Sequence, residues 1–293
     1  MLFVLSPAKT LDYASPAASI EPTVPRWMKE SARLIRGLRR LDAEAIANLM
    51  DLSPRLAELN VGRYQAWKSK NYEAQARPAI FAFDGDVYEG LRARDMDREA
   101  LHWAQGHLRI LSGLYGALRP FDWLQPYRLE MATRFENDRG RDLYAFWGDR
   151  IARSLEEDLK GHSAALVVNL ASEEYFAAVD RRRLRAPVVQ AVFQESRAGS
   201  FKVVSFSAKR ARGLMARWAI ERRIEDPERL KEFAEEGYRF CAEASEARVW
   251  VFRRVVGEPD SSQSINPPQS SRVASQAQPI LASISPLPGS DRS

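Results

Sequence analysis

Polar side chains follow apolar runs at several points in the sequence, and their types suit the binding of an anion. Hydroxyl, amide and cationic groups are the ones that contact phosphate and carboxylate oxygens. In open α/β sheets such groups gather where strands end, and ligands bind there. The residues that we expect to bind an anion are Ser6, Lys9, Thr10, Arg128, Lys209 and Arg212.

The first of these clusters, residues 6–10, comes directly after an apolar run at residues 2–5 that is typical of a strand. Lys9 supplies a point charge for phosphate, and the hydroxyls of Ser6 and Thr10 supply hydrogen bonds. The glycines of a Walker loop are missing. The alternative is an ordinary turn in which Ser6 caps the segment that carries Lys9.

Lys209 and Arg212 lie near the start of a helix that we predict over residues 209–223. Their spacing of three residues places them on neighbouring positions of the helix surface. Two cations at a helix N-terminus oppose the macrodipole, so they cost stability unless an anion binds there. This argument favours a functional site over a solvated helix face.

Carboxylates in the other clusters leave two interpretations open. Arg128 and Glu130 would share one face of an extended segment, where they could simply form an ion pair. Ser172 could cap a short helix carrying Glu173, or Asn169, Ser172 and Glu173 could serve acid–base chemistry. If the protein is an enzyme, Glu130 and Glu173 are the candidate catalytic residues; otherwise no catalytic residue is assigned.

Composition narrows the function classes. The 293 residues carry 44 Lys and Arg against 39 Asp and Glu, a formal net charge of +5, so a polyanion would need cations gathered on one face. One cysteine and three histidines, with His102 and His107 five residues apart, make a zinc site improbable, and no dinucleotide glycine pattern occurs. We expect no metal, no cofactor, no membrane association and a cytoplasmic protein.

The rest of the pattern predicts an α+β or irregular mixed α/β fold in one domain, residues 1–256. Strands are predicted at residues 79–83, 165–168, 188–193, 201–206 and 250–252, and helices at 26–40, 42–50, 97–111, 148–160 and 209–223. Residues 41–63 read as helix, tight turn, helix, with Ser53 and Pro54 opening the second helix. Residues 257–293 hold ten serines and six prolines and predict a disordered tail.

Taken together, these segments resemble the YaaA family of peroxide stress proteins. The resemblance runs from Met1 to about Val255 and rests on LSPAKTLDY (5–13), FDGDVYEGL (83–91), HLRILSGLYG (107–116), LRP (118–120), QPYRLEM (125–131), LYAFWG (143–148), NLASEEYF (169–176) and KRARGLMAR (209–217). It implies a single-domain mixed α/β fold of unusual topology, a helix-hairpin-helix element and a positively charged cleft that binds DNA. It further implies protection against hydrogen peroxide by keeping free intracellular iron low.

Two hypotheses of different classes therefore stand. The first is a non-enzymatic protein, expected to be a monomer, that binds double-stranded or distorted DNA without sequence preference and limits oxidative damage. The second is an enzyme that acts on a phosphorylated nucleoside or a nucleic-acid end, with Lys9, Arg128 and Arg212 holding phosphate. The first is favoured. The number of polar residues placed after strands exceeds what non-specific binding needs, and this keeps the second open.

Overall fold

A mostly parallel sheet organises the chain. The computed structural model describes residues 1–16, 19–197 and 199–256, and the tail predicted at 257–293 lies outside the described residues. The strand order of the sheet is β11-β12-β9-β8-β1-β5-β6, with β10 beside β9. Its strands are β1 (Leu2–Leu5), β5 (Leu108–Ser112), β6 (Gly116–Leu118), β8 (Val167–Leu170), β9 (Val188–Arg197), β10 (Ser200–Lys202), β11 (Arg239–Phe240) and β12 (Val249–Arg254).

Five consecutive strands of the order, β12, β9, β8, β1 and β5, run parallel to one another. Their carboxyl ends therefore meet at one edge. Two small antiparallel pairs complete the strands, β2 (Thr10–Leu11) with β4 (Phe83–Asp84) and β3 (Arg77–Pro78) with β7 (Trp123–Leu124). The predicted mixed α/β fold of irregular order is confirmed.

Helices cover both faces of the central strands. They are α1 (Met28–Leu38), α2 (Ala43–Met50), α3 (Pro54–Ala66), α4 (Ala79–Ala82), α5 (Asp86–Leu91), α6 (Arg98–His107), α7 (Leu143–Trp147), α8 (Arg150–Asp158), α9 (Glu173–Phe176) and α10 (Ser205–Glu221). Phe3 contacts Trp103 of α6, whereas its neighbour Val4 is the register partner of Arg109, which pairs with Asp158 of α8. Because side chains alternate across a strand, α6 and α8 lie on opposite faces.

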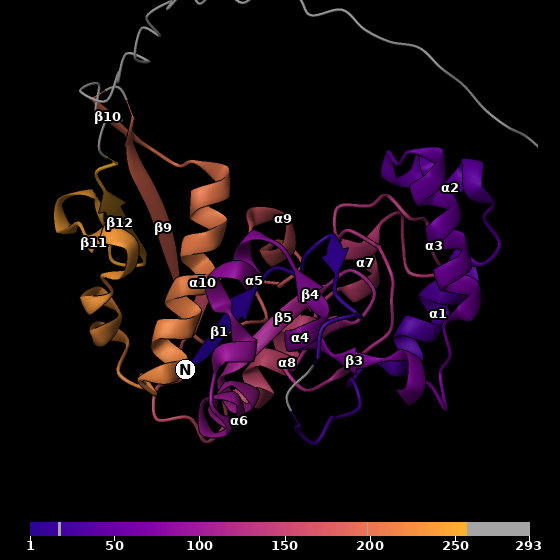
Figure 1. Ribbon diagram of the computed structural model, residues 1–293, viewed down its shortest axis with the longest axis horizontal. Coiled ribbons are helices and arrows are strands. Elements are labelled where there is room, and N and C mark those ends of the chain that lie inside the picture. Colours follow the sequence, from indigo (N-terminus) through magenta and orange to yellow (C-terminus); the bar gives the residue numbers. More distant parts are fainter. Residues whose placement is uncertain (17–18, 198, 257–293) are drawn as a thin grey trace, which may run out of the picture. The chain divides into compact units, whose positions relative to one another are not determined.

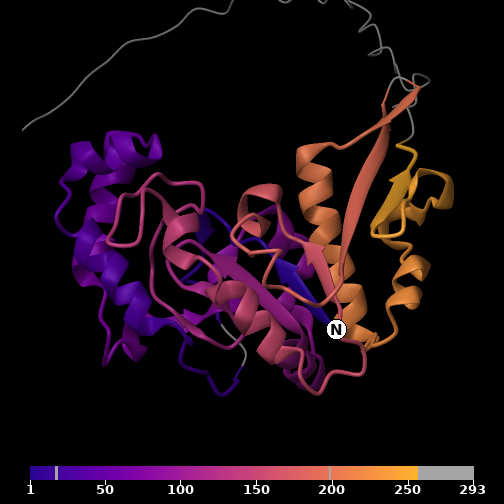
Figure 2. The ribbon, with the colours of Figure 1, turned by 180° about the vertical axis from the view of Figure 1, so that it is seen from behind.

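In the described part of residues 1–256, the helices α1, α2 and α3 lie at one end, and β9, β11, β12 and α10 lie at the other (Figures 1 and 2). Strands β1 and β5 lie between these groups. Strand β1 is completely buried, as expected of a central parallel strand with an unbroken apolar sequence. The strand-end residues of β1 and β8 thus occupy the middle of this unit.

Four of the predicted elements were wrong in type or extent. Ala79–Ala82 is a short helix followed by β4 rather than one strand, because a short buried apolar run fits either element. The helix expected over 97–111 ends at His107, and Leu108–Ser112 is β5, which is fully buried beside β1. The strand expected over 201–206 pairs only over Ser200–Lys202.

The fourth correction concerns α10, which begins at Ser205 rather than at Lys209. Ser207 and Ala208 are already buried, so the packed face of the helix starts upstream of the apolar residues that marked it in the sequence. Lys209 therefore lies in the second turn. The argument that it opposes the macrodipole at the first turn loses its force there.

Two glycines set the position of α10 against α5. A Cβ on Gly90 would lie 2.2 Å from the carbonyl oxygen of Arg210, and one on Gly213 would lie 1.8 Å from that of Val87. The two helices cross with their backbones in contact, which only glycine allows. This crossing holds Lys209 beside the first residue of α5.

Candidate anion-binding site

The site begins where β1 and β8 end. The Ser6 hydroxyl donates to Ser172 Oγ at 3.2 Å and accepts from the Ser172 backbone N–H at 2.8 Å. Ser172 occupies the N-cap position of α9, but its side chain makes no capping hydrogen bond. Tyr88 of α5 donates to the Ser6 carbonyl at 3.0 Å. The two serines thus tie neighbouring strand ends together instead of closing local turns.

Lys9 and Arg128 meet at a single carboxylate. Lys9 Nζ lies 3.2 Å from Glu130 Oε2, and Arg128 Nη2 lies 2.8 Å from Glu130 Oε1. The expected ion pair between Arg128 and Glu130 is therefore present, and Lys9 joins it from a segment 119 residues away, the difference between positions 9 and 128. The Lys9 side chain is 66% exposed and the Arg128 side chain 16%. The single carboxylate of Glu130 thus pairs with two cations, and the exposed ammonium of Lys9 is accessible to a second anion.

Helix α3 positions Arg128 and adds a third cation. The Tyr64 hydroxyl donates to the Arg128 carbonyl oxygen. Beside it, burial lowers the pKa of Arg63, and the charge of Arg128 lowers it further. Asn60 accepts from Arg63 at 3.4 Å, and no carboxylate of the described residues pairs with this guanidinium. Arg63 was missed in the sequence because its position within an ordinary helical pattern carries no signal.

Gln125 anchors the segment that leads to Arg128. Its side chain accepts from the Lys68 N–H at 2.8 Å and donates to the Lys68 carbonyl at 2.7 Å. Trp67 at the end of α3 donates to the Tyr115 hydroxyl at 2.9 Å. The hairpin of α2 and α3 therefore holds the segment with Gln125 and Arg128 in place.

That hairpin has the predicted helix–turn–helix order. Pro54 is the first residue of α3, as expected, and Ser53 precedes it without a side-chain capping bond. Asp51 ends α2 in the left-handed region, with φ at 51°, and its N–H bonds to the Ala47 carbonyl. An aspartate thus takes the conformation that glycine usually takes after a helix.

Lys209 is linked to this region through α5. Its Nζ lies 3.7 Å from Asp86 Oδ2 at the first residue of α5. The preceding residue, Gly85, lies beside Ala8, since a Cβ on Gly85 would be 3.6 Å from the Ala8 Cβ. Lys209 and the Lys9 segment therefore flank the same end of α5.

Unlike Lys9, Arg128 and Lys209, Arg212 has no acidic partner among the described residues. The Nε atom is buried and makes no hydrogen bond, and no carboxylate of the described residues pairs with this guanidinium. Burial lowers its pKa, with no compensating charge. It lies one turn beyond Lys209, and at 100° per residue it falls between Lys209 on one side and the buried Ala208 and Ala219 on the other. Buried guanidinium groups are normally paired.

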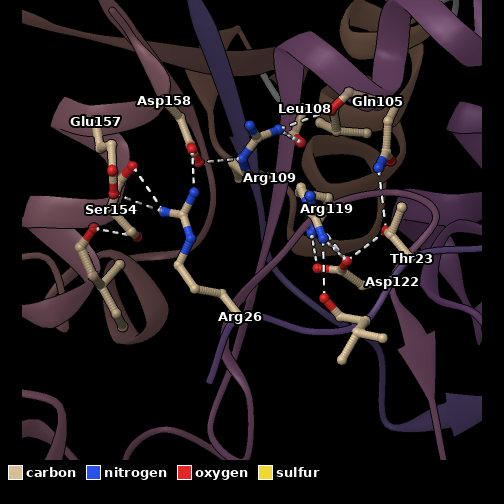
Figure 3. Close-up of polar contacts among 12 residues, drawn as sticks. Thr23, Arg26, Gln105, Leu108, Arg109, Arg119, Asp122, Ser154, Glu157 and Asp158 are labelled. Atoms are coloured by element: carbon tan, nitrogen blue, oxygen red, sulfur yellow. Dashed lines mark hydrogen bonds and ion pairs between the residues drawn. The ribbon is translucent and has the colours of Figure 1, made fainter. Parts of the chain in front are cut away.

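Arginines at the opposite edge of the sheet show the usual arrangement. There, Arg109 and Arg26 share Asp158, and Arg119 bonds to Asp122, which also accepts from Thr23 (Figure 3). Burial lowers the pKa of Arg109, whereas Asp158 raises it. The buried Arg109 thus has an acidic partner, whereas Arg212 has none among the described residues.

Other expected residues take different places. Thr10 lies in β2 opposite Asp84, with an exposed side chain. Glu173 lines a pocket with Asn169 and forms no hydrogen bond with Glu130, so these two candidate acids are not joined. Within the described ranges no group of three or more His, Cys, Asp or Glu side chains is placed to hold a metal ion.

Buried tyrosines complete the surroundings. Burial raises the pKa values of Tyr88, Tyr127 and Tyr175 above their ordinary range, and neighbouring tyrosines raise each of them further. Tyr127 Oη lies 2.6 Å from Ser112 Oγ at the end of β5. All three hydroxyls therefore stay neutral and can donate hydrogen bonds at the strand ends.

Comparison with known proteins identifies the family to which this chain belongs. A family model described as "Peroxide stress protein YaaA" matches residues 1–244. The chain belongs to the YaaA peroxide stress protein family. A UPF0246 protein of Bordetella petrii is 56% identical over 254 residues, which cover 87% of this chain and 99% of that protein.

Further relatives agree with the family assignment. A UPF0246 protein of Burkholderia cenocepacia (strain HI2424) is 54% identical over 260 residues, 88% of this chain and all of that protein. One from Polynucleobacter necessarius is 51% identical over 255 residues. The YaaA resemblance drawn from the motifs is thereby confirmed. Separately, none of the helices in the described residues is long and apolar enough to span a membrane.

Proposed function

We propose that this protein binds DNA through a basic cleft at the strand ends, largely without sequence specificity, and acts as a cytoplasmic monomer in peroxide stress. The observation that supports this most is Arg212, a partly buried guanidinium with an unpaired Nε and no acid partner. Such a group costs free energy unless an anion reaches it. A DNA phosphate is an anion that suits a guanidinium fork.

A shortage of acids around the other cations supports the same proposal. Glu130 is shared by Lys9 and Arg128, and Arg63 nearby has no carboxylate partner among the described residues. These cations come from the β1 end, from α3 and from the segment before Glu130. Cations gathered on one surface hold a polyanion by phosphate contacts and carry no sequence information.

Fluorescence anisotropy with two unrelated duplexes of equal length tests the proposal. We expect the dissociation constants to agree within about tenfold, far less than the discrimination of a sequence-specific protein. Lys9→Ala should weaken binding to both duplexes equally. Arg153→Ala is the matched control, because Arg153 is also exposed, at 69%, and paired with one acid, Asp149. Equal effects of the two variants, or a preference above about a hundredfold for one duplex, would contradict the proposal.

The physiological part of the proposal is that the protein limits oxidative damage by keeping free intracellular iron low. The peroxide-stress role is supported by the family to which the chain belongs, and the link to iron is what the resemblance to that family implies. The test is the electron paramagnetic resonance signal of chelatable iron in peroxide-stressed cells that lack the gene or carry Lys9→Ala. We expect more free iron in both strains than in the parent. Unchanged iron in the deletion strain would refute this part.

A second candidate function is an enzyme that acts on a phosphorylated nucleoside or a nucleic-acid end in the same cleft. It is favoured by Glu173, whose carboxylate lines a pocket and has no hydrogen-bond or ion-pair partner among the described residues. Such a carboxylate is available for proton transfer. Incubation of DNA oligonucleotides and nucleotides with the parent and with Glu173→Gln, followed by mass spectrometry, tests it. Products formed equally by both proteins would exclude Glu173 as the catalytic acid or base.

A further inference from the structure

A pocket of about 520 Å³ lies at the carboxyl end of β8 and beside β9. Its walls include Tyr144, Asn169, Glu173, Phe176, Arg181 and Gln190. This volume is in the range of small-molecule binding sites.

Hydrogen-bonding groups in the pocket are left without protein partners. Asn169 and Gln190 are register partners on the parallel strands β8 and β9, so their side chains lie on the same face. Asn169 Oδ1 accepts from the Ala171 N–H at 2.9 Å, which fixes the carboxamide and leaves its NH2 group free to donate. Gln190 is exposed, and no side-chain hydrogen bond to it occurs among the described residues, nor to Glu173.

One wall of the pocket is aromatic. Phe176 is 8% exposed, and the guanidinium carbon of Arg181 lies 5.8 Å from the centre of its ring. The Tyr144 hydroxyl donates to the Glu174 carbonyl at 3.0 Å, which fixes this ring at the pocket. Aromatic faces and guanidinium planes are the surfaces on which flat heterocycles stack.

A flat ligand with donors and acceptors along its edge fits this combination. Carboxamides pair with the edges of nucleobases, and carboxylates accept from their amino groups. Glu173 directly follows Ser172, whose hydroxyl is bonded to Ser6, and Lys9 lies three residues further along that strand end. We therefore expect a strand whose phosphates contact Lys9 to run close to the pocket.

We propose that this pocket takes one unpaired nucleobase of a DNA strand, at an end, a gap or an extruded position. The inference rests on the proposed function, since DNA must reach the site. A base must lose its pairing and stacking energy to enter the pocket. This cost is smallest where the base is already unpaired. The protein should therefore distinguish DNA by structure and not by sequence.

The test uses the full chain and duplexes that carry 2-aminopurine either unpaired opposite a gap or fully paired. Unpaired 2-aminopurine should change its fluorescence saturably on binding, and paired 2-aminopurine should not. Gln190→Leu should reduce the affinity read by this signal at least tenfold, while anisotropy with the fully paired duplex stays at the parental value. Gln194→Leu is the control, because Gln194 follows on the same face of β9, bonds to Arg253 and does not line the pocket.

Adenosine 5′-monophosphate, titrated by calorimetry, separates this inference from the proposed function. If DNA fails to bind and the nucleotide binds the parent but not Gln190→Leu, the DNA proposal fails and the pocket assignment stands. If DNA binds and Gln190→Leu keeps both the full 2-aminopurine signal and the parental nucleotide affinity, the pocket assignment is wrong. Equal signals from paired and unpaired 2-aminopurine would also overturn it.

Discussion

Replacing Arg212 by methionine should stabilise the protein and weaken DNA binding. The Nε atom of Arg212 is buried without a hydrogen bond, and no acid among the described residues neutralises the guanidinium. A buried unsatisfied polar group costs roughly 1–3 kcal/mol. Methionine keeps much of the side-chain volume and removes the polar atoms. We therefore expect the free energy of unfolding to rise by about 1 kcal/mol, which corresponds to roughly 2–4 °C in Tm for a domain of this size.

DNA affinity should change in the opposite direction. A hydrogen bond to a charged group contributes roughly 1.5–3 kcal/mol, so its loss should weaken binding by about 10- to 100-fold. Urea denaturation monitored by fluorescence gives the stability, and anisotropy gives the dissociation constant. Added phosphate should raise the Tm of the parent and leave that of Arg212→Met almost unchanged, since the anion stabilises only a protein that binds it.

Arg109→Met is the matched control, because Arg109 is a buried arginine that Asp158 neutralises. Removing one partner of a buried ion pair leaves an isolated charge and costs roughly 3–5 kcal/mol. We expect this variant to be strongly destabilised. The reasoning about Arg212 is refuted if Arg212→Met is destabilised by more than about 1 kcal/mol while its DNA affinity stays at the parental value.

Three more results are expected. Glu130→Gln should strengthen DNA binding several-fold, because it frees Lys9 and Arg128 from their shared acid; weaker binding in an anisotropy titration would oppose this. Deleting residues 257–293, which carry three acids and two arginines, should leave the Tm and the dissociation constant unchanged; a lower Tm would assign the tail a role in folding. Burial lowers the pKa of His162 to about 4, so its neutral form favours the fold above pH 6.5 and this contribution is lost as the pH falls toward 4. His162→Asn should therefore flatten the decline of stability between these pH values, and an unchanged decline would show that other groups cause it.

Local sequence was sufficient where an element carries its own pattern. The run Leu2–Leu5 is a buried strand and residues 41–63 contain two helices, because an unbroken apolar run and a Ser-Pro helix start each have a local cause. The same reasoning failed for Ala79–Ala82 and for Leu108–Ser112, where burial on all sides removes the periodicity that separates helix from strand.

The candidate site shows where such reasoning stops. The residue types of Lys9, Arg128 and Glu130 are visible in the sequence, but their shared contact depends on α3 holding the Arg128 backbone through Tyr64. Arg63 became part of the site only through that packing. Likewise, the sequence suggested Ser172 as a helix cap, and the structure shows its hydroxyl bonded to Ser6 on the next strand. Contacts between distant segments carry no local signal.

The dependence of DNA binding on salt tests the central claim most directly. The logarithm of the binding constant should fall linearly with the logarithm of the salt concentration, with a slope of about −0.9 per phosphate contact. Lys9→Ala, Arg128→Ala and Arg212→Met should each make the slope shallower by about 1, and Arg153→Ala should leave it unchanged. A flat salt response of the parent, or slopes that none of the three substitutions alters, would contradict DNA binding at the strand ends.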